Sequence, residues 1–421
     1  MRILRKIKDI YIKVHYWGFK GVIDYFRGFI PDRIHRYRLR HCFLRNARKF
    51  PMKPITGITI IADFTARGSL NKVIRDLAFS LQDAKIPYQT FNTAMTDDIP
   101  LQDVAGILTP KSEFRLLRYT HIITLMVNPL PSELNLRPHA LFFWEFSTGV
   151  LRGYPDILNS TSIIGMSDFN VECFSKAVPP TIPVYKILYP FRFIDVPDCA
   201  VADVRSRYGL SEKDFVVFYN FDFRSSCNRK NPQAVLRAFR QAFRGIEKAK
   251  LLFKTKGAQE YPAKLAELMS LAESLGISDQ FICVNDYIPQ RDVYGLTAAC
   301  DVYVSLHRGE GFGLGIAEAM SLGKPVVVTD YSATTEFCNV ENSIPVPYKL
   351  VRPAMDLIDH AYYVDVQEWA EPDVVFAGKA IHRLYENPAL RRELGRKAKE
   401  SIHNQFSMTA FRESIEAFLA N

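Results

Sequence analysis

The chain of 421 residues lacks an apolar run that is long enough to cross a membrane. Its longest runs, such as Phe215 to Phe223, fall well short of the roughly 18 residues that a transmembrane helix needs. A cleavable signal peptide is not recognisable either, because charges recur through Lys13 and no uninterrupted apolar stretch follows. We therefore expect a soluble, cytoplasmic protein, and the length suits two domains of roughly 150 to 200 residues.

Cysteine is scarce and scattered. The seven cysteines are an odd number and form no C-x-x-C pair, whereas a zinc site or a disulfide framework needs closer spacing. We expect reduced thiols. The chain also lacks a G-x-G-x-x-G fingerprint directly after the first strand of either predicted domain, which argues against a nicotinamide-dependent dehydrogenase.

Positive charge is missing from most of the chain. Residues 1–50 contain fourteen Lys or Arg and three Asp, so their net charge is +11. The net charge of the whole chain is +9, so the other 371 residues carry −2. A nucleic-acid groove spread over the fold would need basic residues throughout. We therefore expect no nucleic-acid partner.

The basic N-terminal segment is amphipathic. On a helical wheel five apolar residues fall within an arc of about 80°: Ile3, Ile7, Ile10, Val14 and Trp17. Six basic residues lie on the other side: Arg2, Arg5, Lys6, Lys8, Lys13 and Lys20. Such a helix suits an anionic membrane surface. The alternative is a helix packed on the protein body, for which so one-sided a charge excess is unusual. We predict that residues 1–50 hold the protein peripherally on the inner face of the plasma membrane.

Strand and helix signals alternate in two series, which predicts an α/β fold with two Rossmann-like domains. The first series, in a domain of residues 51–195, has strands at 57–62, 121–127, 140–144 and 162–166 and a helix at 70–82. The second, in a domain of residues 205–387, has strands at 215–219, 249–253, 281–284, 302–306 and 325–329. A charged helical tail, 388–421, is expected to pack back towards the first domain. Ligands of such sheets bind at the carboxyl ends of the strands, here in a cleft between the domains.

The segment from Glu310 to Glu318 is the sharpest motif. Glycines alternate at 311, 313 and 315, and each would cost up to about 1 kcal/mol inside a helix, so they mark a loop whose backbone closely approaches something. A helix is predicted to start near Leu314, and its free N–H groups and dipole favour a phosphate. A plain connection with two solvated glutamates is the alternative, but few plain connections use three glycines and two spaced acids.

The two carboxylates predict a sugar diphosphate. Glu310 precedes the helix and Glu318 lies about one turn within it, so the two lie on opposite sides of the bound anion and can accept hydrogen bonds from hexose and ribose hydroxyls. His307 could bind donor hydroxyls or satisfy backbone groups of the loop. Lys254 ends a predicted strand that faces the same cleft and is a phosphate candidate.

This motif resembles a known family. Glu-x7-Glu followed by Ala319 to Thr329 looks like the signature of glycosyltransferase family 4, whose members are retaining enzymes of GT-B fold. The fuller string from Ser305 to Leu314 is similar to a bacterial branch that acts in surface-polysaccharide assembly. The resemblance is strong over 205–340, weaker around Asn128-Pro129 and Phe143-Trp144-Glu145, and absent from residues 1–50.

The resemblance implies roles for individual residues on the donor side. Glu310 would contact the transferred sugar, Glu318 would contact the ribose, and the amides of Phe312, Gly313 and Leu314 would meet the sugar and the diphosphate.

In the family an Arg and a Lys neutralise the leaving diphosphate. Lys230 matches the Lys, while Arg224 is one residue off the expected spacing, so Arg229 stays open as its alternative. Tyr287 lies in the stretch whose backbone often reads the base. On the acceptor side the candidates are Gly68, Asn128 and Glu145.

We thus predict a hexosyltransferase that moves a sugar from a nucleotide diphosphate sugar to a hydroxyl, with retained configuration, on a lipid-linked or growing surface glycan. A same-face mechanism is our hypothesis, because the sequence offers no strand-end carboxylate pair for a double displacement. No Asp-x-Asp motif lies near the donor loop, so no metal or other cofactor is expected. The alternative is a catalytically idle sugar-nucleotide-binding scaffold at the membrane, which the intact Glu310 and glycines disfavour.

Overall fold

The computed structural model describes residues 35–46, 54–94, 99, 101–126, 129–130, 132–150, 155–354, 366 and 368–421. These residues form two compact units. Unit 1 consists of Glu145–Gly149 and Phe193–Gln405, and unit 2 consists of the described part of 35–144, Val150–Arg192 and Phe406–Asn421. Each unit contains a six-stranded sheet, which confirms the predicted α/β fold with two Rossmann-like domains.

The sheet of unit 2 is entirely parallel, in the order β2-β1-β3-β4-β5-β6. Its strands are β1 (Ile55–Ala62), β2 (Tyr88–Asn92), β3 (Tyr119–Leu125), β4 (His139–Leu141), β5 (Ser162–Gly165) and β6 (Val184–Lys186). Strands covered on both faces need near-continuous apolar sequence, and Gly57 to Ala62 of β1 are all buried. Helix α2 (Ser69–Asp83) follows β1, and α5 (Asp168–Ala177) follows β5.

Residues 35–46 form a helix that contributes to the core of unit 2. Phe43 is fully buried in a cluster with Ile61, Phe91 and Phe114. The Asn46 amide donates to the Phe114 carbonyl at 3.0 Å, and its oxygen accepts from the Leu116 amide at 2.6 Å. The sequence pattern groups these residues with the basic N-terminal segment 1–50, of which residues 1–34 and 47–50 lie outside the described part of the chain.

The charged tail folds into two helices that cluster with different units. Helix α13 (Pro388–Gln405) lies in unit 1, where a Cβ atom on Gly395 would come within 2.1 Å of the Gly323 carbonyl oxygen. Helix α14 (Met408–Leu419) lies in unit 2, where the Phe418 ring centroid is 5.1 Å from that of His121 and 5.0 Å from that of His139. The glycine at position 395 thus permits close packing that a larger residue would prevent.

The sheet of unit 1 is also entirely parallel, in the order β12-β11-β10-β7-β8-β9. Its strands are β7 (Phe215–Asp222), β8 (Ala249–Lys256), β9 (Phe281–Asn285), β10 (Val302–Ser305), β11 (Val326–Thr329) and β12 (Ile344–Val346). An antiparallel hairpin of β13 (Tyr348–Val351) and β14 (Trp369–Pro372) follows. The strands predicted in this half of the chain are confirmed.

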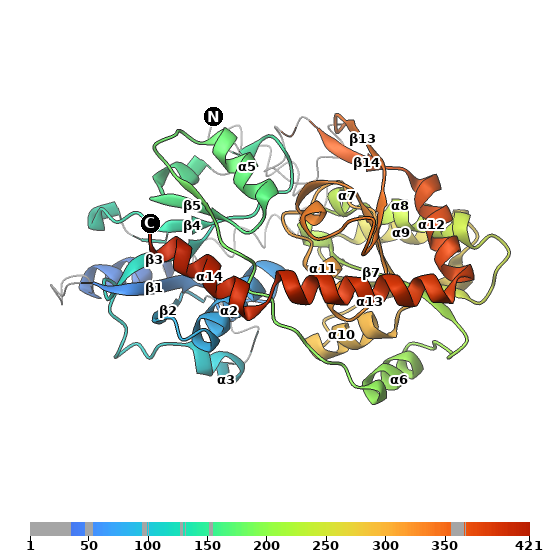
Figure 1. The fold of residues 1–421 in the computed structure, drawn as a ribbon, viewed down its shortest axis with the longest axis horizontal. Helices are drawn as coiled ribbons and strands as arrows, with labels where there is room; N and C mark the ends of the chain where they lie inside the picture. Colours follow the sequence, from blue (N-terminus) through green and yellow to red (C-terminus); the bar gives the residue numbers. More distant parts are fainter. Residues whose placement is uncertain are drawn as a thin grey trace. The chain divides into compact units, whose positions relative to one another are not determined.

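Helices pack on this sheet in two groups (Figure 1). One group contains α8 (Pro232–Ala242), α9 (Pro262–Ser274) and α12 (Val374–Glu386). The other contains α6 (Asp198–Arg207), α10 (Gln290–Ala299), α11 (Leu314–Ser321) and α13. The start of α11 agrees with the predicted helix start near Leu314. None of the helices in the described ranges combines the length and apolar character that a membrane span requires.

The buried position of Phe43 predicts that the 35–46 helix stabilises unit 2. Phe43→Ala should lower the free energy of unfolding by about 3 to 5 kcal/mol, because it removes a core ring and leaves a cavity. Tyr37→Ala, at an exposed position of the same helix, should change it by less than about 0.5 kcal/mol. Urea unfolding of both variants measures the difference. Equal, small effects would show that the helix is dispensable for the core.

Candidate active site

The glycine-rich loop connects β10 to α11 through close contacts with protein atoms. Gly313 precedes α11 with φ of +91°, a conformation that favours glycine, and a Cβ atom there would lie 2.5 Å from Thr334 Cγ2. A Cβ atom on Gly315 would lie 2.6 Å from both Asn220 Oδ1 and the Tyr303 hydroxyl. The close approach that the sequence predicts is therefore, at these two positions, an approach to neighbouring side chains.

Glu310 is buried at the centre of a charged cluster. Its amide donates to Ser332 Oγ at 2.8 Å, and its carboxylate contacts Lys230 Nζ and lies 3.5 Å from Arg229 Nη1. Burial alone would raise the pKa of Glu310, but the charges of Lys230 and Arg229 outweigh it and hold the pKa at about 2. The carboxylate is therefore ionised at neutral pH.

Lys230 is presented by the short helix α7 (Cys227–Lys230). Asn231 then adopts a left-handed conformation, and Pro232 begins α8, so the chain turns sharply next to the lysine. The Tyr219 hydroxyl of β7 donates to the Lys230 carbonyl at 2.7 Å. This bond ties α7 to the carboxyl end of the sheet, which is where the sequence places Lys230.

Arg229 lies deeper in the same cluster and is only 3% exposed. Its guanidinium donates to the Gly309 carbonyl at 2.7 Å and to the Ser225 carbonyl at 2.8 Å. The Glu145 carboxylate lies 3.5 Å from the same guanidinium, on Nη2. Of the two arginines that the sequence left open, Arg229 is the one that the fold places beside Glu310.

Arg224 lies in the short 3-10 turn Phe223–Ser225 that follows β7, with a side chain that is 34% exposed. It pairs with Asp222 at 3.2 Å and with Glu260 at 3.7 Å, and Nη2 donates to the Tyr287 hydroxyl at 2.5 Å. The fold thus brings the candidates Arg224 and Tyr287 together, as a group separate from the cluster around Glu310.

His307 is fully buried behind the cluster. Thr334 Oγ1 donates to the Tyr331 carbonyl at 3.1 Å and lies 3.3 Å from His307 Nε2, so Nε2 carries the proton that Thr334 accepts. Nδ1 is then an acceptor, and among the described residues it has no hydrogen-bond partner. Burial lowers the pKa of His307 to about 4, so the ring is neutral at pH 7.

Three further candidates on the donor side are buried. The Glu318 carboxylate on α11 accepts from the Tyr294 hydroxyl of α10 at 3.2 Å. Phe312 packs on Phe337 with 5.5 Å between ring centroids. Lys254 at the end of β8 donates to the Thr255 carbonyl at 3.0 Å, and burial, helped by the charge of nearby Lys256, lowers its pKa to about 8.

The acceptor-side candidates do not form one group. Gly68 precedes α2 in unit 2. Glu145 clusters with unit 1 and contacts Arg229, and a Cβ atom on Gly309 would come within 2.3 Å of the Glu145 carbonyl oxygen. Asn128 lies outside the described residues.

Arg308 is a structural residue of the site that the sequence does not reveal. Its guanidinium pairs with both carboxylate oxygens of Glu371, at 2.7 and 3.1 Å, and lies 4.6 Å from the centre of the Trp369 ring. It also donates to the Asn228 carbonyl at 2.6 Å. Arg308 thereby links the loop after β10 and helix α7 to the β13–β14 hairpin. The link to the hairpin is made through Glu371, which lies 63 positions further along the chain.

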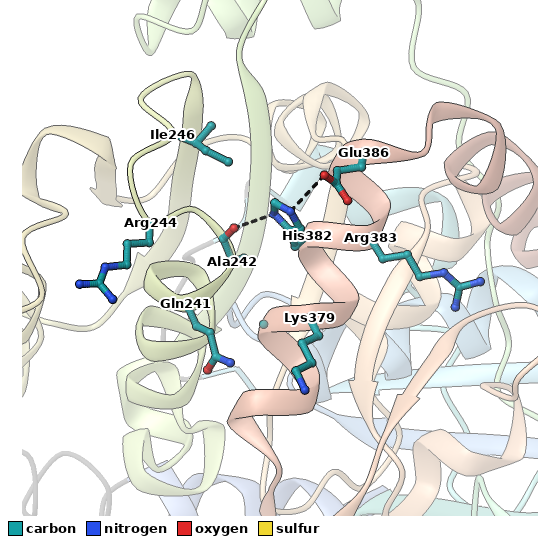
Figure 2. Close-up of a pocket in the computed structure, with 9 residues that line it drawn as sticks. Gln241, Ala242, Arg244, Ile246, Lys379, His382, Arg383 and Glu386 are labelled. Atoms are coloured by element: carbon teal, nitrogen blue, oxygen red, sulfur yellow. Dashed lines mark hydrogen bonds and ion pairs between the residues drawn. The ribbon is translucent and has the colours of Figure 1, made fainter.

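A surface pocket of about 440 Å³ lies elsewhere in unit 1, between α8 and α12 (Figure 2). His382 Nδ1 donates to the Ala242 carbonyl at 2.8 Å, and Nε2 lies 3.3 Å from Glu386 Oε1. Arg244, Lys379 and Arg383 point in different directions in Figure 2, so they do not converge on one anion. None of the residues predicted for the site lines this pocket.

In the part of the chain that the structure describes, no cluster of three or more His, Cys, Asp or Glu side chains is arranged to hold a metal ion.

Comparison with known sequences finds partial matches to this chain. A family model described as "Glycosyl transferases group 1" matches residues 215–360. The chain is 25% identical over 206 residues to N-acetyl-alpha-D-glucosaminyl L-malate synthase of Bacillus anthracis, and 38% identical over 71 residues to the lipopolysaccharide core biosynthesis mannosyltransferase LpsB of Rhizobium meliloti. These matches cover 49% and 17% of this chain but only 45% and 19% of the two relatives.

Similarity to solved structures extends further along the chain. The crystal structure of Anabaena Alr3699/HepE in complex with UDP and glucose matches 87% of this chain and 100% of its own, with a TM-score of 0.63 and 16% identity. At this identity the likeness shows the fold, which is the GT-B arrangement of two Rossmann-like domains.

The low pKa of Glu310 predicts a pH-dependent contribution to stability. A folded-state pKa of about 2 lies below the ordinary 4.5, so the contribution is complete above pH 4.5 and is lost as the pH falls through about 2. Its size is about 3 kcal/mol. Glu310→Gln should therefore be less stable than the wild type at pH 6, and the gap should narrow below pH 4.5.

Urea unfolding at a series of pH values measures this gap. Glu273→Gln, at an exposed position on α9, serves as the control and should track the wild type throughout. A gap that stays constant from pH 6 to pH 2.5 would contradict the assigned ion pairs.

Proposed function

We propose that the chain moves a sugar from a nucleotide diphosphate sugar to a hydroxyl acceptor with retained configuration, as the match of residues 215–360 to the group 1 glycosyltransferases suggests. The observation that carries the proposal is the buried cluster of Glu310, Lys230 and Arg229 beside the start of α11. It offers a fixed carboxylate for sugar hydroxyls and a cation for the diphosphate in one place.

The difficult step is departure of the diphosphate while the anomeric carbon gains positive charge. Lys230 and the N–H groups at the start of α11 stabilise the negative charge that develops on the leaving group. In this mechanism protein groups, and no metal ion, stabilise the leaving diphosphate. In the same-face mechanism, the leaving phosphate helps to deprotonate the acceptor hydroxyl as that hydroxyl attacks.

Contacts with the transferred sugar come from two buried side chains. Glu310 accepts hydrogen bonds from sugar hydroxyls, and its ionised form is the strong acceptor. The open acceptor Nδ1 of His307 favours a second contact of the same kind. Both side chains accept, which suits a hexose with neighbouring hydroxyls.

The nucleotide half of the donor extends from α11 to the ends of β7 to β9. Glu318 binds the ribose hydroxyls, Lys254 binds a phosphate, and Arg224 and Tyr287 lie at the base. The amides of Phe312, Gly313 and Leu314 lead from the sugar to the diphosphate. A uridine nucleotide is proposed because Alr3699/HepE was crystallised with UDP and glucose.

The acceptor is proposed to be a lipid-linked or growing surface glycan. Of the two relatives, one is named for lipopolysaccharide core biosynthesis and the other is named N-acetyl-alpha-D-glucosaminyl L-malate synthase. We assign Gly68, Asn128 and Glu145 to the acceptor side.

Release of UDP from UDP-sugars tests the proposal directly. Lys230→Met should reduce the rate of donor hydrolysis and of transfer by roughly 100- to 1,000-fold, because it removes the cation that stabilises the leaving group. Lys379→Met, at an exposed position on α12, should leave both rates unchanged. Thermal melting of both variants checks that they fold. A wild type that binds UDP-sugars tightly yet neither hydrolyses nor transfers them is an idle scaffold, and the proposal then fails.

We also propose that the basic segment 1–50 places the protein on the cytoplasmic face of an anionic membrane. In its described part, 35–46, four arginines are exposed and acidic residues are absent: Arg36, Arg38, Arg40 and Arg45. Phe43 and Asn46 fix this helix to unit 2. Exposed bases next to Tyr37, which is 59% exposed, suit phospholipid headgroups.

Vesicle binding tests the membrane assignment. The double variant Arg38→Glu/Arg45→Glu should bind vesicles of phosphatidylglycerol and phosphatidylcholine at least ten-fold more weakly, since each base near such a surface contributes about 1 kcal/mol. Lys213→Glu/Arg291→Glu makes the same change of charge at exposed positions of unit 1 and should bind like the wild type. If both double variants lose the same vesicle affinity, the effect depends on net charge alone, and the 35–46 helix is not a specific membrane-binding surface.

A further inference from the structure

The Arg229 guanidinium lies between two carboxylates and is held in a fixed orientation. Glu310 Oε2 and Glu145 Oε1 are each 3.5 Å from it, on different nitrogens. The carbonyls of Gly309 and Ser225 accept from the same two nitrogens at 2.7 and 2.8 Å. Four partners thus fix a planar group that is 3% exposed.

Lys230 is held differently, although it is the adjacent residue. Its ammonium group contacts Glu310, and its side chain is 17% exposed against 4% for that of Arg229. An ammonium on a flexible four-carbon chain can change partners with little rearrangement, whereas a guanidinium with four fixed partners cannot. The two cations of the cluster are therefore not equivalent.

The charges of the resting cluster balance, with two cations and two carboxylates. A donor diphosphate adds negative charge, so a cation that binds it must leave a carboxylate. If Lys230 were the sole partner of Glu310, its departure would leave a buried carboxylate uncompensated, which destabilises the protein or drives protonation of the carboxylate. A protonated Glu310 would be a weaker acceptor for sugar hydroxyls.

We infer that Arg229 is a positioning residue that keeps Glu310 ionised and oriented while Lys230 exchanges Glu310 for the diphosphate of the donor. The inference rests on the proposed function, because it assumes that Lys230 and Glu310 bind the diphosphate and the sugar. It adds that the two adjacent cations have different roles. Arg229 remains paired with Glu310, and Lys230 binds the diphosphate of the donor.

The other groups that face Glu310 do not replace Arg229. His307 from the end of β10 is neutral at pH 7. Tyr219 on β7 and Tyr303 on β10 are neutral as well, because burial raises the pKa of both hydroxyls. Glu145 faces the far side of Arg229 and is itself an anion. Among these neighbours, Arg229 is the cation that remains when Lys230 turns to the donor.

The pH profile of kcat/KM for donor hydrolysis tests the inference. The acid limb of this profile is the pH range in which kcat/KM falls as the pH is lowered. In Arg229→Met the midpoint of the acid limb should rise by at least one pH unit, and kcat should fall by roughly 10- to 100-fold. The affinity for UDP, which has no sugar, should change by less than three-fold, because Lys230 and the start of α11 remain. Arg229→Lys keeps the charge and should restore the acid limb to within about 0.3 units of the wild type.

Arg205→Met is the matched control, because Arg205 also donates to backbone carbonyls, those of Ala299, Ser211 and Asp214, away from Glu310. It should lower stability without moving the acid limb. An acid limb that stays in place in Arg229→Met, or a loss of UDP affinity equal to the loss of kcat, would reduce Arg229 to a packing residue and overturn the inference.

A second measurement does not depend on turnover. In the Arg229→Met background, the pH window over which Glu310→Gln changes the free energy of unfolding should move upwards from about pH 2 towards 4.5. If the wild type proves inactive, the proposed function fails. The pH range over which Glu310→Gln changes the free energy of unfolding still decides whether Arg229 keeps Glu310 ionised. If Arg229→Met does not fold, the window is measured in Arg229→Lys, where it should stay in place, and an upward shift there overturns the inference.

Discussion

The pairing of a buried Glu310 carboxylate with the two cations at the end of α7 is the interaction on which the site depends. A buried carboxylate is tolerated only if it is compensated, so α7 and the loop after β10 must meet. The backbone strengthens this meeting, because the Arg308 amide donates to the Arg229 carbonyl at 2.8 Å and Arg229 returns a bond to the Gly309 carbonyl at 2.7 Å. Loop and helix are thus one structural unit, and the ion pairs orient it.

The glycines of the loop serve this arrangement as much as they serve a ligand. Side chains at Gly309, Gly313 and Gly315 would each come within 2.6 Å of a neighbouring protein atom. The contact at Gly309 is with the Glu145 carbonyl, which brings the Glu145 carboxylate within reach of Arg229. Close packing at one glycine therefore sets the position of a charged group on another segment. This explains why the motif combines glycines with acids over so short a stretch.

Much of the fold follows from the sequence, because parallel strands that are covered on both faces need continuous apolar runs and the helices between them alternate regularly. Two short strands were not predicted from the sequence. Strand β2 has the largely polar sequence Tyr-Gln-Thr-Phe-Asn, and β6 has only three residues, so neither forms a continuous apolar run. For the proposed site, spacing pointed to Glu310, Lys230 and the start of α11, but it could not tell whether Arg224 or Arg229 lies beside Glu310. That choice depends on the three-dimensional turn at Ser226 and on Glu145, which lies far away in sequence. Likewise, no local pattern links Arg308 to Glu371.

The difference between a lysine and an arginine gives adjacent residues different tasks in this cluster. A guanidinium offers five N–H donors in a rigid plane, so it can satisfy two carbonyls and two carboxylates together, as Arg229 does. An ammonium is a point charge on a flexible chain and suits a partner that comes and goes. Exchanging the two residue types would place the mobile charge in the buried position and the rigid one where the donor binds. The order Arg229-Lys230 therefore places the fixed cation beside the buried carboxylate and the movable cation where an anion can bind.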